Sequence, residues 1–377
     1  MEVVMSETEM YQNLESVPSV DADLDILIKK SCFVSGETDD KTLVSLCGSL
    51  QSFSAEAAVI SQPDPGSYDS RHTKLSLGVR SHPRSYSTNE LQPERNKSSD
   101  FSPNVQVLST FSITAERVIS ICPLSDNTAI INYFKRFNCY VVSVDGQVKK
   151  KLKFDFAAGK IIMTSHGDII AIDCYKQLLH QLTTEGVKTQ IISTSPLRPI
   201  SLCEASDGNL LVSLIEKSSF KVEKSSRRLV SRITMDGTTA ESFEFHNRSR
   251  LFTWPFGVSE NINKDICVVD RTSQTSGRVV VVDNNGKLRY IYEGQKLDLP
   301  FNPAEVKCDK SCHVIVNDTN NNKIYMLDMN GQFIGYIANE NILKYGPSCL
   351  ELDMNGILWV GGYKGYVYRL RFIRTLE

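Results

Sequence analysis

Residues 301–337, FNPAEVKCDKSCHVIVNDTNNNKIYMLDMNGQFIGYI, contain four short apolar segments that are separated by polar turns. The apolar residues alternate with polar ones or form short blocks, a pattern typical of strands and not of helices. The sequence predicts strands over 304–308, 313–317, 323–328 and 332–337, with glycine and asparagine at turns that need positive φ angles. A single sheet of four strands leaves two apolar faces exposed, so it must pack against further copies of itself.

Copies of this unit recur along the chain at intervals of roughly 40 to 55 residues, the spacing typical of propeller blades. The turn between the first two strands recurs at Asp126-Asn127, His166-Gly167, Asp207-Gly208, Asn263-Lys264, Lys310-Ser311 and Asn355-Gly356. The turn before the last strand recurs at Asp145-Gly146, Glu185-Gly186, Asp236-Gly237, Asn285-Gly286 and Asn330-Gly331. The sixth copy therefore lacks its last strand, and the alternating segment Val105–Ser112 is expected to supply it and to close the ring. We predict an all-β fold, a six-bladed β-propeller over residues 103–377.

Residues 1–102 differ in composition from the rest of the chain. They are rich in serine, and residues 1–100 carry 16 acidic and 9 basic side chains, whereas the remainder carries 28 and 33. A segment with low hydrophobicity and an excess of charge cannot bury enough surface to offset the entropy lost on folding. We expect an acidic arm that is mostly disordered. Within it, residues 21–50 contain several Leu, Ile and Val side chains and are a candidate for a short helix or docking segment.

The composition also indicates the compartment. The sequence has no run of about 18 apolar residues, so no membrane span is expected. The N-terminus, MEVVMSETEM, has acidic residues where a secretory signal needs basic ones. Most of the ten cysteines lie singly within predicted strands, which favours reduced thiols in the cytoplasm. No cofactor is predicted, since the sequence has no glycine-rich loop for a phosphate group.

Residues 318–333, DTNNNKIYMLDMNGQF, resemble the NHL repeat, in which an Asp-rich loop with an Asn pair and a basic residue precedes an apolar strand that ends in Asp-x-x-Gly. Residues 280–288 (VVVDNNGKL) and 352–360 (LDMNGILWV) are similar. The resemblance is to the C-terminal propellers of TRIM-NHL and TRIM-like proteins, including the expanded sets in molluscs. It extends over about residues 103–377 and is clearer in blades 4 to 6 than in blades 1 to 3.

Proteins of that family usually begin with a RING finger, B-boxes and a coiled coil, and the zinc sites of the first two need closely spaced Cys and His pairs. Residues 1–100 hold only Cys32, Cys47, His72 and His82, which are far apart in the sequence. Ubiquitin-ligase chemistry would need a RING that this chain lacks, so the chain is predicted not to be an enzyme. The resemblance implies a non-catalytic protein-recognition propeller, similar to the substrate-recognition part of these ligases, with an unidentified protein partner.

The loops between second and third strands share one rim of a propeller with the loops between blades. We predict a ligand-binding rim from the basic, aromatic and amide side chains in these loops: Tyr133, Lys135, Arg136, Tyr175, Lys176, Arg198, Arg271, Asn302, Tyr363 and Lys364. Basic residues among aromatic ones fit the binding of single-stranded RNA in post-transcriptional regulation, the alternative function. They equally fit a protein interface, or ordinary loop content. No membrane partner is expected.

A third hypothesis is a metal-dependent propeller hydrolase with carboxylates around the central channel. Glu204, Glu305 and Glu351 lie on predicted first strands, which line the channel. Nothing in the sequence brings a Ser, a His and an Asp into the arrangement of a nucleophilic triad. We therefore predict neither a catalytic site nor a metal site.

Overall fold

The computed structural model describes residues 104–125, 127–134, 138–216, 223 and 225–373. The predicted acidic arm, with its candidate helix over residues 21–50, lies outside the described residues. Within the described residues no helix is long and apolar enough to cross a membrane.

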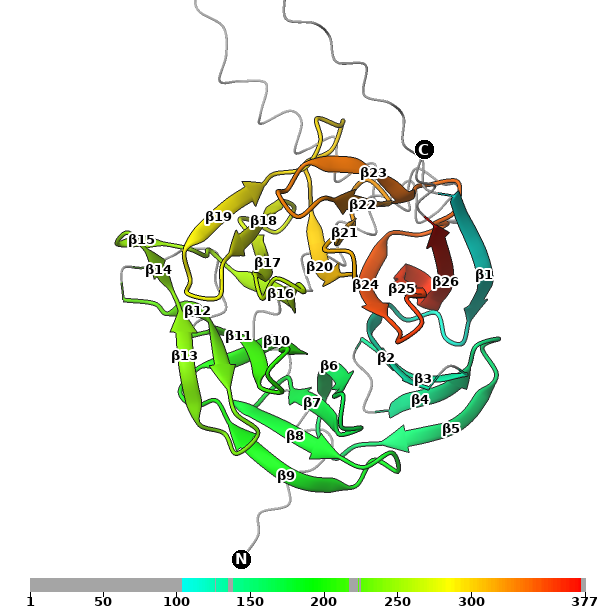
Figure 1. Cartoon of the computed structure of the whole chain (residues 1–377). Coiled ribbons are helices and arrows are strands. Elements are labelled where there is room, and N and C mark those ends of the chain that lie inside the picture. The colour runs from blue at the N-terminus through cyan, green and yellow to red at the C-terminus, as the bar shows by residue number, and fades with distance from the viewer. Residues whose placement is uncertain (1–103, 126, 135–137, 217–222, 224, 374–377) are drawn as a thin grey trace, which may run out of the picture. The chain divides into compact units, whose positions relative to one another are not determined.

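Six antiparallel sheets of four strands each surround a central channel (Figure 1). Blade 1 contains β2 (Val118–Ser125), β3 (Thr128–Tyr133), β4 (Asn138–Ser143) and β5 (Val148–Lys153); blade 2 contains β6 (Ala158–Met163), β7 (Ile169–Asp173), β8 (Leu178–Leu182) and β9 (Lys188–Ser193). Blade 3 contains β10 (Arg198–Glu204), β11 (Leu210–Ile215), β12 (Arg228–Ile233) and β13 (Thr239–Phe243); blade 4 contains β16 (Pro255–Glu260), β17 (Ile266–Arg271), β18 (Gly277–Val282) and β19 (Leu288–Tyr292). Blade 5 contains β20 (Pro303–Cys308), β21 (Val314–Asp318), β22 (Lys323–Leu327) and β23 (Phe333–Ala338). The prediction of an all-β, six-bladed propeller is confirmed.

Blade 6 is assembled from both ends of the propeller sequence. It contains β24 (Pro347–Leu352), β25 (Leu358–Gly362), β26 (Tyr366–Ile373) and, on its outside, β1 (Asn104–Ser112). β1 pairs antiparallel with β26, from Asn104 opposite Ile373 to Ser112 opposite Tyr366. Residues 105–112 thus occupy the place for which they were expected, and the pairing covers the edge that β26 would otherwise expose.

The apolar core is divided into six clusters, one between each pair of neighbouring blades. The cluster that joins blade 6 to blade 1 contains Trp359 and Val367 from one side and Val118, Ile131 and Tyr133 from the other. Because every blade buries both of its faces against neighbours, the second strands are buried along their whole length, as in β7 and β25.

The turns have the conformation that their residues predict. Gly286, Gly331 and Gly356 have φ angles of 78°, 82° and 74°, in the left-handed region. At each of these turns an aspartate three residues earlier accepts hydrogen bonds from two backbone N–H groups, as Asp328 does from Asn330 and Gln332.

The closing strand generates the first prediction. A variant that begins at residue 113 lacks β1 and exposes β26 together with the apolar side chains that β1 covers. Its melting temperature should be lower by roughly 10 °C or more than that of a variant that begins at residue 103, as measured by calorimetry. Equal melting temperatures would show that β1 contributes nothing to ring closure.

Candidate functional site

The inner strand of every blade has the same irregularity. In β2, β6, β16, β20 and β24 the register with the second strand shifts after the first residue, and in β10 it shifts after the second, which is the signature of a β-bulge. After the bulge the six strands are in equivalent register, and side chains two residues apart lie on the same side of a strand. The channel is therefore lined by two successive rings of six residues.

The first ring consists of Ser120, Lys160, Ser201, Gly257, Glu305 and Cys349, and the second ring of Cys122, Ile162, Cys203, Ser259, Lys307 and Glu351. Each ring contains one lysine and one glutamate, and the other members carry no full charge. The two rings together are electrically neutral.

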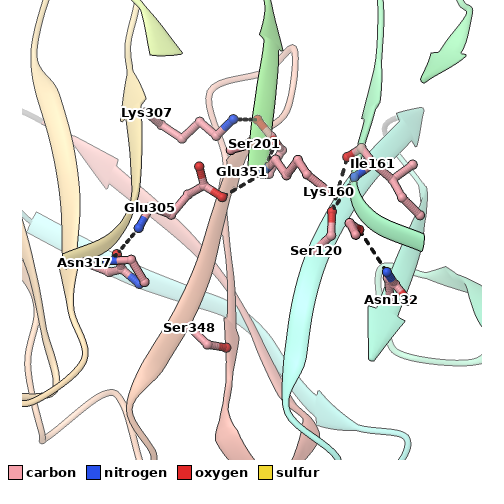
Figure 2. A network of polar contacts seen from close by, with 12 residues as sticks. Ser120, Asn132, Lys160, Ile161, Ser201, Glu305, Lys307, Asn317, Ser348 and Glu351 are labelled. Carbon is pink, nitrogen blue, oxygen red and sulfur yellow. Dashed lines mark hydrogen bonds and ion pairs between the residues drawn. The ribbon is translucent and has the colours of Figure 1, made fainter. Parts of the chain in front are cut away.

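The four charged side chains form one network (Figure 2). Lys160 Nζ lies 2.9 Å from Glu305 Oε2 and 3.2 Å from Glu351 Oε2, and Lys307 Nζ lies 2.9 Å from Glu351 Oε1. Since Lys160 belongs to blade 2 and Glu305 to blade 5, the opposite blade of the ring, the Lys160 side chain crosses the channel.

Burial and pairing fix the protonation states of this network. Burial acts to lower the pKa of Lys160, but the carboxylates of Glu305 and Glu351 outweigh it and raise that pKa above its ordinary value. Burial acts to raise the pKa of Glu351, but Lys307 and Lys160 outweigh it and lower that pKa. Lys160 is therefore an ammonium ion, and Glu351 a carboxylate, at neutral pH.

Part of the first ring is polar but unpaired. Glu305 Oε1 and the hydroxyl of Ser201 are buried and have no hydrogen-bond partner among the described residues. Gly257 lies beside this carboxylate oxygen, and a β-carbon at this position would be 3.3 Å from it. Glycine at position 257 thus leaves room for the Glu305 side chain.

The second ring forms the floor of an open cavity of about 250 Å³ at one mouth of the channel. All six residues of the second ring line this cavity, together with Pro123, Met163, Glu204, Cys308 and Leu352. Lys307 and Glu351 are the charged groups of the floor, with side chains that are 6% and 16% exposed. We call this cavity the channel mouth.

Other groups at the mouth have structural roles. The Glu204 carboxylate accepts hydrogen bonds from the backbone N–H and the hydroxyl of Ser165 in the neighbouring blade. Burial raises the pKa of Cys203 to about 12, so this thiol is not ionised at neutral pH and is a poor nucleophile.

The channel does not fit the metal centre considered from the sequence. Within the described part of the chain, no group of three or more His, Cys, Asp and Glu side chains is placed to hold a metal ion. The Glu305 and Glu351 carboxylates are paired with two ammonium groups, whose charge would repel a cation at the same place.

The predicted rim is divided between exposed and buried residues. Tyr175, Lys176 and Lys364 are exposed, Arg198 and Tyr363 are half-buried, and Lys135 and Arg136 lie outside the described residues.

Three of the predicted rim residues belong to the interior instead. Tyr133 is fully buried between blades 6 and 1, because its ring completes the apolar cluster there. Arg271 and Asn302 are 6% and 3% exposed and hydrogen-bond each other at 3.2 Å. These three side chains are not available on a rim, since structural contacts between blades hold them.

Lys160 and Lys307 were not among the site residues predicted from the sequence. Glu305 and Glu351 were identified as channel candidates, but without the partners that their burial requires. The signal was present: each lysine lies in an inner strand among apolar residues, in AGKIIM and PAEVKC. A charged residue within such a strand needs an opposite charge when it is buried.

The fold is shared with known enzymes. No family model and no curated protein matches the sequence. Among solved structures, a gluconolactonase from Xanthomonas campestris is similar, with a TM-score of 0.55 and 14% identity over 71% of this chain and 89% of that chain. Virginiamycin B lyase from Staphylococcus aureus is similar with a TM-score of 0.51 and 14% identity over 71% of this chain and 99% of that one. A histidine-to-alanine variant of this lyase with quinupristin, described as catalytically inactive, has a TM-score of 0.50 and 14% identity over 71% and 99%.

These comparisons overturn two predictions. The chain was expected to be a non-catalytic binding module and not an enzyme, whereas the propellers to which it is similar are a lactonase and a lyase. The prediction rested on the absent RING and on the lack of a Ser-His-Asp triad, and neither of these bears on chemistry by lysine and glutamate side chains within the ring. At 14% identity the likeness establishes the fold and not the activity.

The ion network generates a stability prediction. Replacing Lys160→Met leaves two buried carboxylates without this partner and should lower the free energy of unfolding by about 3–5 kcal/mol in urea titrations at pH 7. Adding Glu305→Leu to this variant should restore most of the loss, because an unpaired buried charge is removed. Lys150→Met, on the exposed outer strand β5, is the matched control and should change little. A loss as small as that of the control would show that Lys160 is not part of a buried network.

The pKa of Glu351 generates a second prediction at this site. A carboxyl whose pKa is lower in the folded than in the unfolded state stabilises the fold above its unfolded pKa, and this contribution is lost as the pH falls through the folded pKa. The free energy of unfolding should therefore decrease as the pH is lowered below about 4.5. In Glu351→Gln this decrease should be less steep. An unchanged slope would show that Glu351 does not contribute to the pH dependence of the free energy of unfolding.

Proposed function

We propose that this chain is a propeller enzyme of the hydrolase or lyase class and that its reaction takes place in the channel mouth. The observation that carries the proposal is a lysine and a glutamate, Lys307 and Glu351, held 2.9 Å apart at the floor of an open cavity. The activities named for the similar propellers support the class of reaction.

Lys307 would bind the substrate's carbonyl oxygen. Its ammonium group lies at the cavity floor, where little water surrounds it, and its position is fixed by the ion pair with Glu351. A fixed positive charge in a site of low dielectric stabilises the negative charge that develops on a carbonyl oxygen, as in ester or lactone cleavage.

Glu351 would accept the proton. For a hydrolase the proton comes from the attacking water, and for a lyase it comes from the carbon atom next to the carbonyl group. The ion pairs make Glu351 a weak base in the resting site. Its basicity would increase during the reaction, because Lys307 would share its charge with the developing oxyanion.

Lys160 would act as a positioning residue. Its side chain crosses the channel behind the second ring and contacts the same carboxylate as Lys307. It would hold Glu351 in place and close the channel, so that substrate and water reach the reacting groups only from the mouth.

This arrangement would differ from that of the similar lyase. The inactive histidine-to-alanine variant of that enzyme indicates that a histidine is needed there. Among the described residues that line the channel mouth in this chain there is no histidine. We therefore assign the role of proton acceptor to Glu351.

We also propose, on the resemblance of residues 318–333, 280–288 and 352–360, that the ring is related to NHL propellers. The relation would concern the repeat and its turns, not a ligase activity. A cytoplasmic location stays a prediction.

For the full-length protein we expect hydrolysis of glucono-δ-lactone, followed by acid release, or of a chromogenic aryl acetate. Lys307→Met and Glu351→Gln should each reduce kcat/KM by roughly 10²-fold or more, because each removes a group that acts in the transition state. The wild-type rate should be constant from about pH 5 to 9, since Glu351 is ionised throughout this range.

Lys150→Met and Glu293→Gln, both on exposed side chains, are the matched controls and should leave the rate unchanged. Circular dichroism of each variant shows whether a loss of activity comes from the changed site or from unfolding of the protein. Equal turnover by wild type and Lys307→Met, or no turnover of either probe, would overturn the proposal.

A further inference from the structure

Two thiols meet where blades 4 and 5 pack against each other. Cys267, the second residue of β17, is fully buried, and Cys308 is the last residue of β20. Cys308 donates a hydrogen bond to Cys267, with 3.6 Å between the two sulfur atoms. All described cysteines are free thiols.

The two cysteines differ in accessibility. Cys308 lines the channel mouth and is partly exposed, so a small solute reaches it. Cys267 is closed off from solvent, and the hydrogen bond from Cys308 together with burial holds its pKa well above the ordinary value. An oxidant in solution would therefore react first at Cys308.

The sulfur atoms are close enough to be joined. A disulfide bond is about 2.05 Å long, so the sulfur atoms must approach by roughly 1.5 Å. Side-chain rotation and a small shift at the end of β20 can supply this distance. This end leads directly into the turn at 309–313, where Cys312 already has a φ angle of 64°.

The Tyr290 side chain lies near the two thiols. The hydroxyl of Tyr290 is buried and has no hydrogen-bond partner among the described residues. Burial, and next the nearby thiols of Cys267 and Cys308, raise the pKa of Tyr290, so the hydroxyl keeps its proton. This protonated hydroxyl is a hydrogen-bond donor near the two thiols, without an acceptor in the described part of the chain.

We propose that Cys308 and Cys267 form a site of reversible thiol oxidation, in which peroxide oxidises Cys308 and Cys267 resolves the product into a disulfide. In the first step the Cys308 thiol gives up its proton, the thiolate attacks one oxygen of hydrogen peroxide, the O–O bond breaks, and Cys308 becomes a sulfenic acid. The hydroxide that leaves takes up the proton from the thiol and is released as one water. In the second step the sulfur of Cys267 attacks the sulfenic sulfur, its proton leaves with the hydroxyl group, and a second water is released. Each bridge consumes one peroxide, and a thiol reductant restores both thiols.

The disulfide would change the position of a residue at the floor of the channel mouth. Lys307 precedes Cys308 directly, and its ammonium group holds Glu351. A bridge that pulls the end of β20 toward β17 would displace this lysine. The thiol site itself does not depend on the proposed function.

The test uses the full-length protein, treated with a small excess of hydrogen peroxide, then blocked with N-ethylmaleimide and digested without reductant. Mass spectrometry should find the peptides of Cys267 and Cys308 joined, with a mass lower by two hydrogen atoms, and reduction should separate them. In Cys267→Ser the bridge should be lost and dimedone should label Cys308.

Cys203→Ser is the matched control, since Cys203 lines the same cavity, and it should still form the bridge. A bridge from Cys308 to Cys312, a bridge between two molecules, or oxidation that leaves Cys308 unmodified would each overturn the proposal.

Discussion

Six inner strands that surround one axis bring their inward side chains close together, and the chemistry of the ring depends on which side chains these are. In this chain they include two lysines and two glutamates, which neutralise each other as a single buried network. Lys160 connects opposite blades through Glu305, so the network also links parts of the ring that share no apolar cluster. If one member of the network is removed, a buried charge of opposite sign is left without a partner. The stability of the folded ring therefore depends on all four side chains together.

The network divides the channel. Behind the second ring, Lys160 crosses the channel, whereas in front of it Lys307 and Glu351 face an open cavity. The same charges that disfavour a metal ion at this place supply a fixed ammonium group and a fixed carboxylate. The similar propellers include a lactonase and a lyase, which fits a scaffold whose inner strands can be given different reacting groups while the blades stay the same.

The blade count, the turns and the closing strand could be predicted from the sequence because each is encoded locally. Asp328 and Gly331, for example, specify their turn through one carboxylate and one positive φ angle. The channel network could not be predicted in this way. Lys160 and Glu305 are 145 residues apart, and only the curvature of the whole ring brings them together. Tyr133, Arg271 and Asn302 were misplaced for a similar reason, since the loop sequences do not indicate which side chains turn inward between blades.

The most direct test of the ion network is a crystal structure of the propeller soaked in Mn²⁺, with an anomalous difference map of the channel. We predict no anomalous peak near Glu305 and Glu351, and density for the Lys160 and Lys307 side chains in contact with these carboxylates. A peak within coordination distance of both glutamates, with the lysines turned away, would contradict this prediction. The channel would then be a metal centre, and neither lysine could have the role that we assign to it.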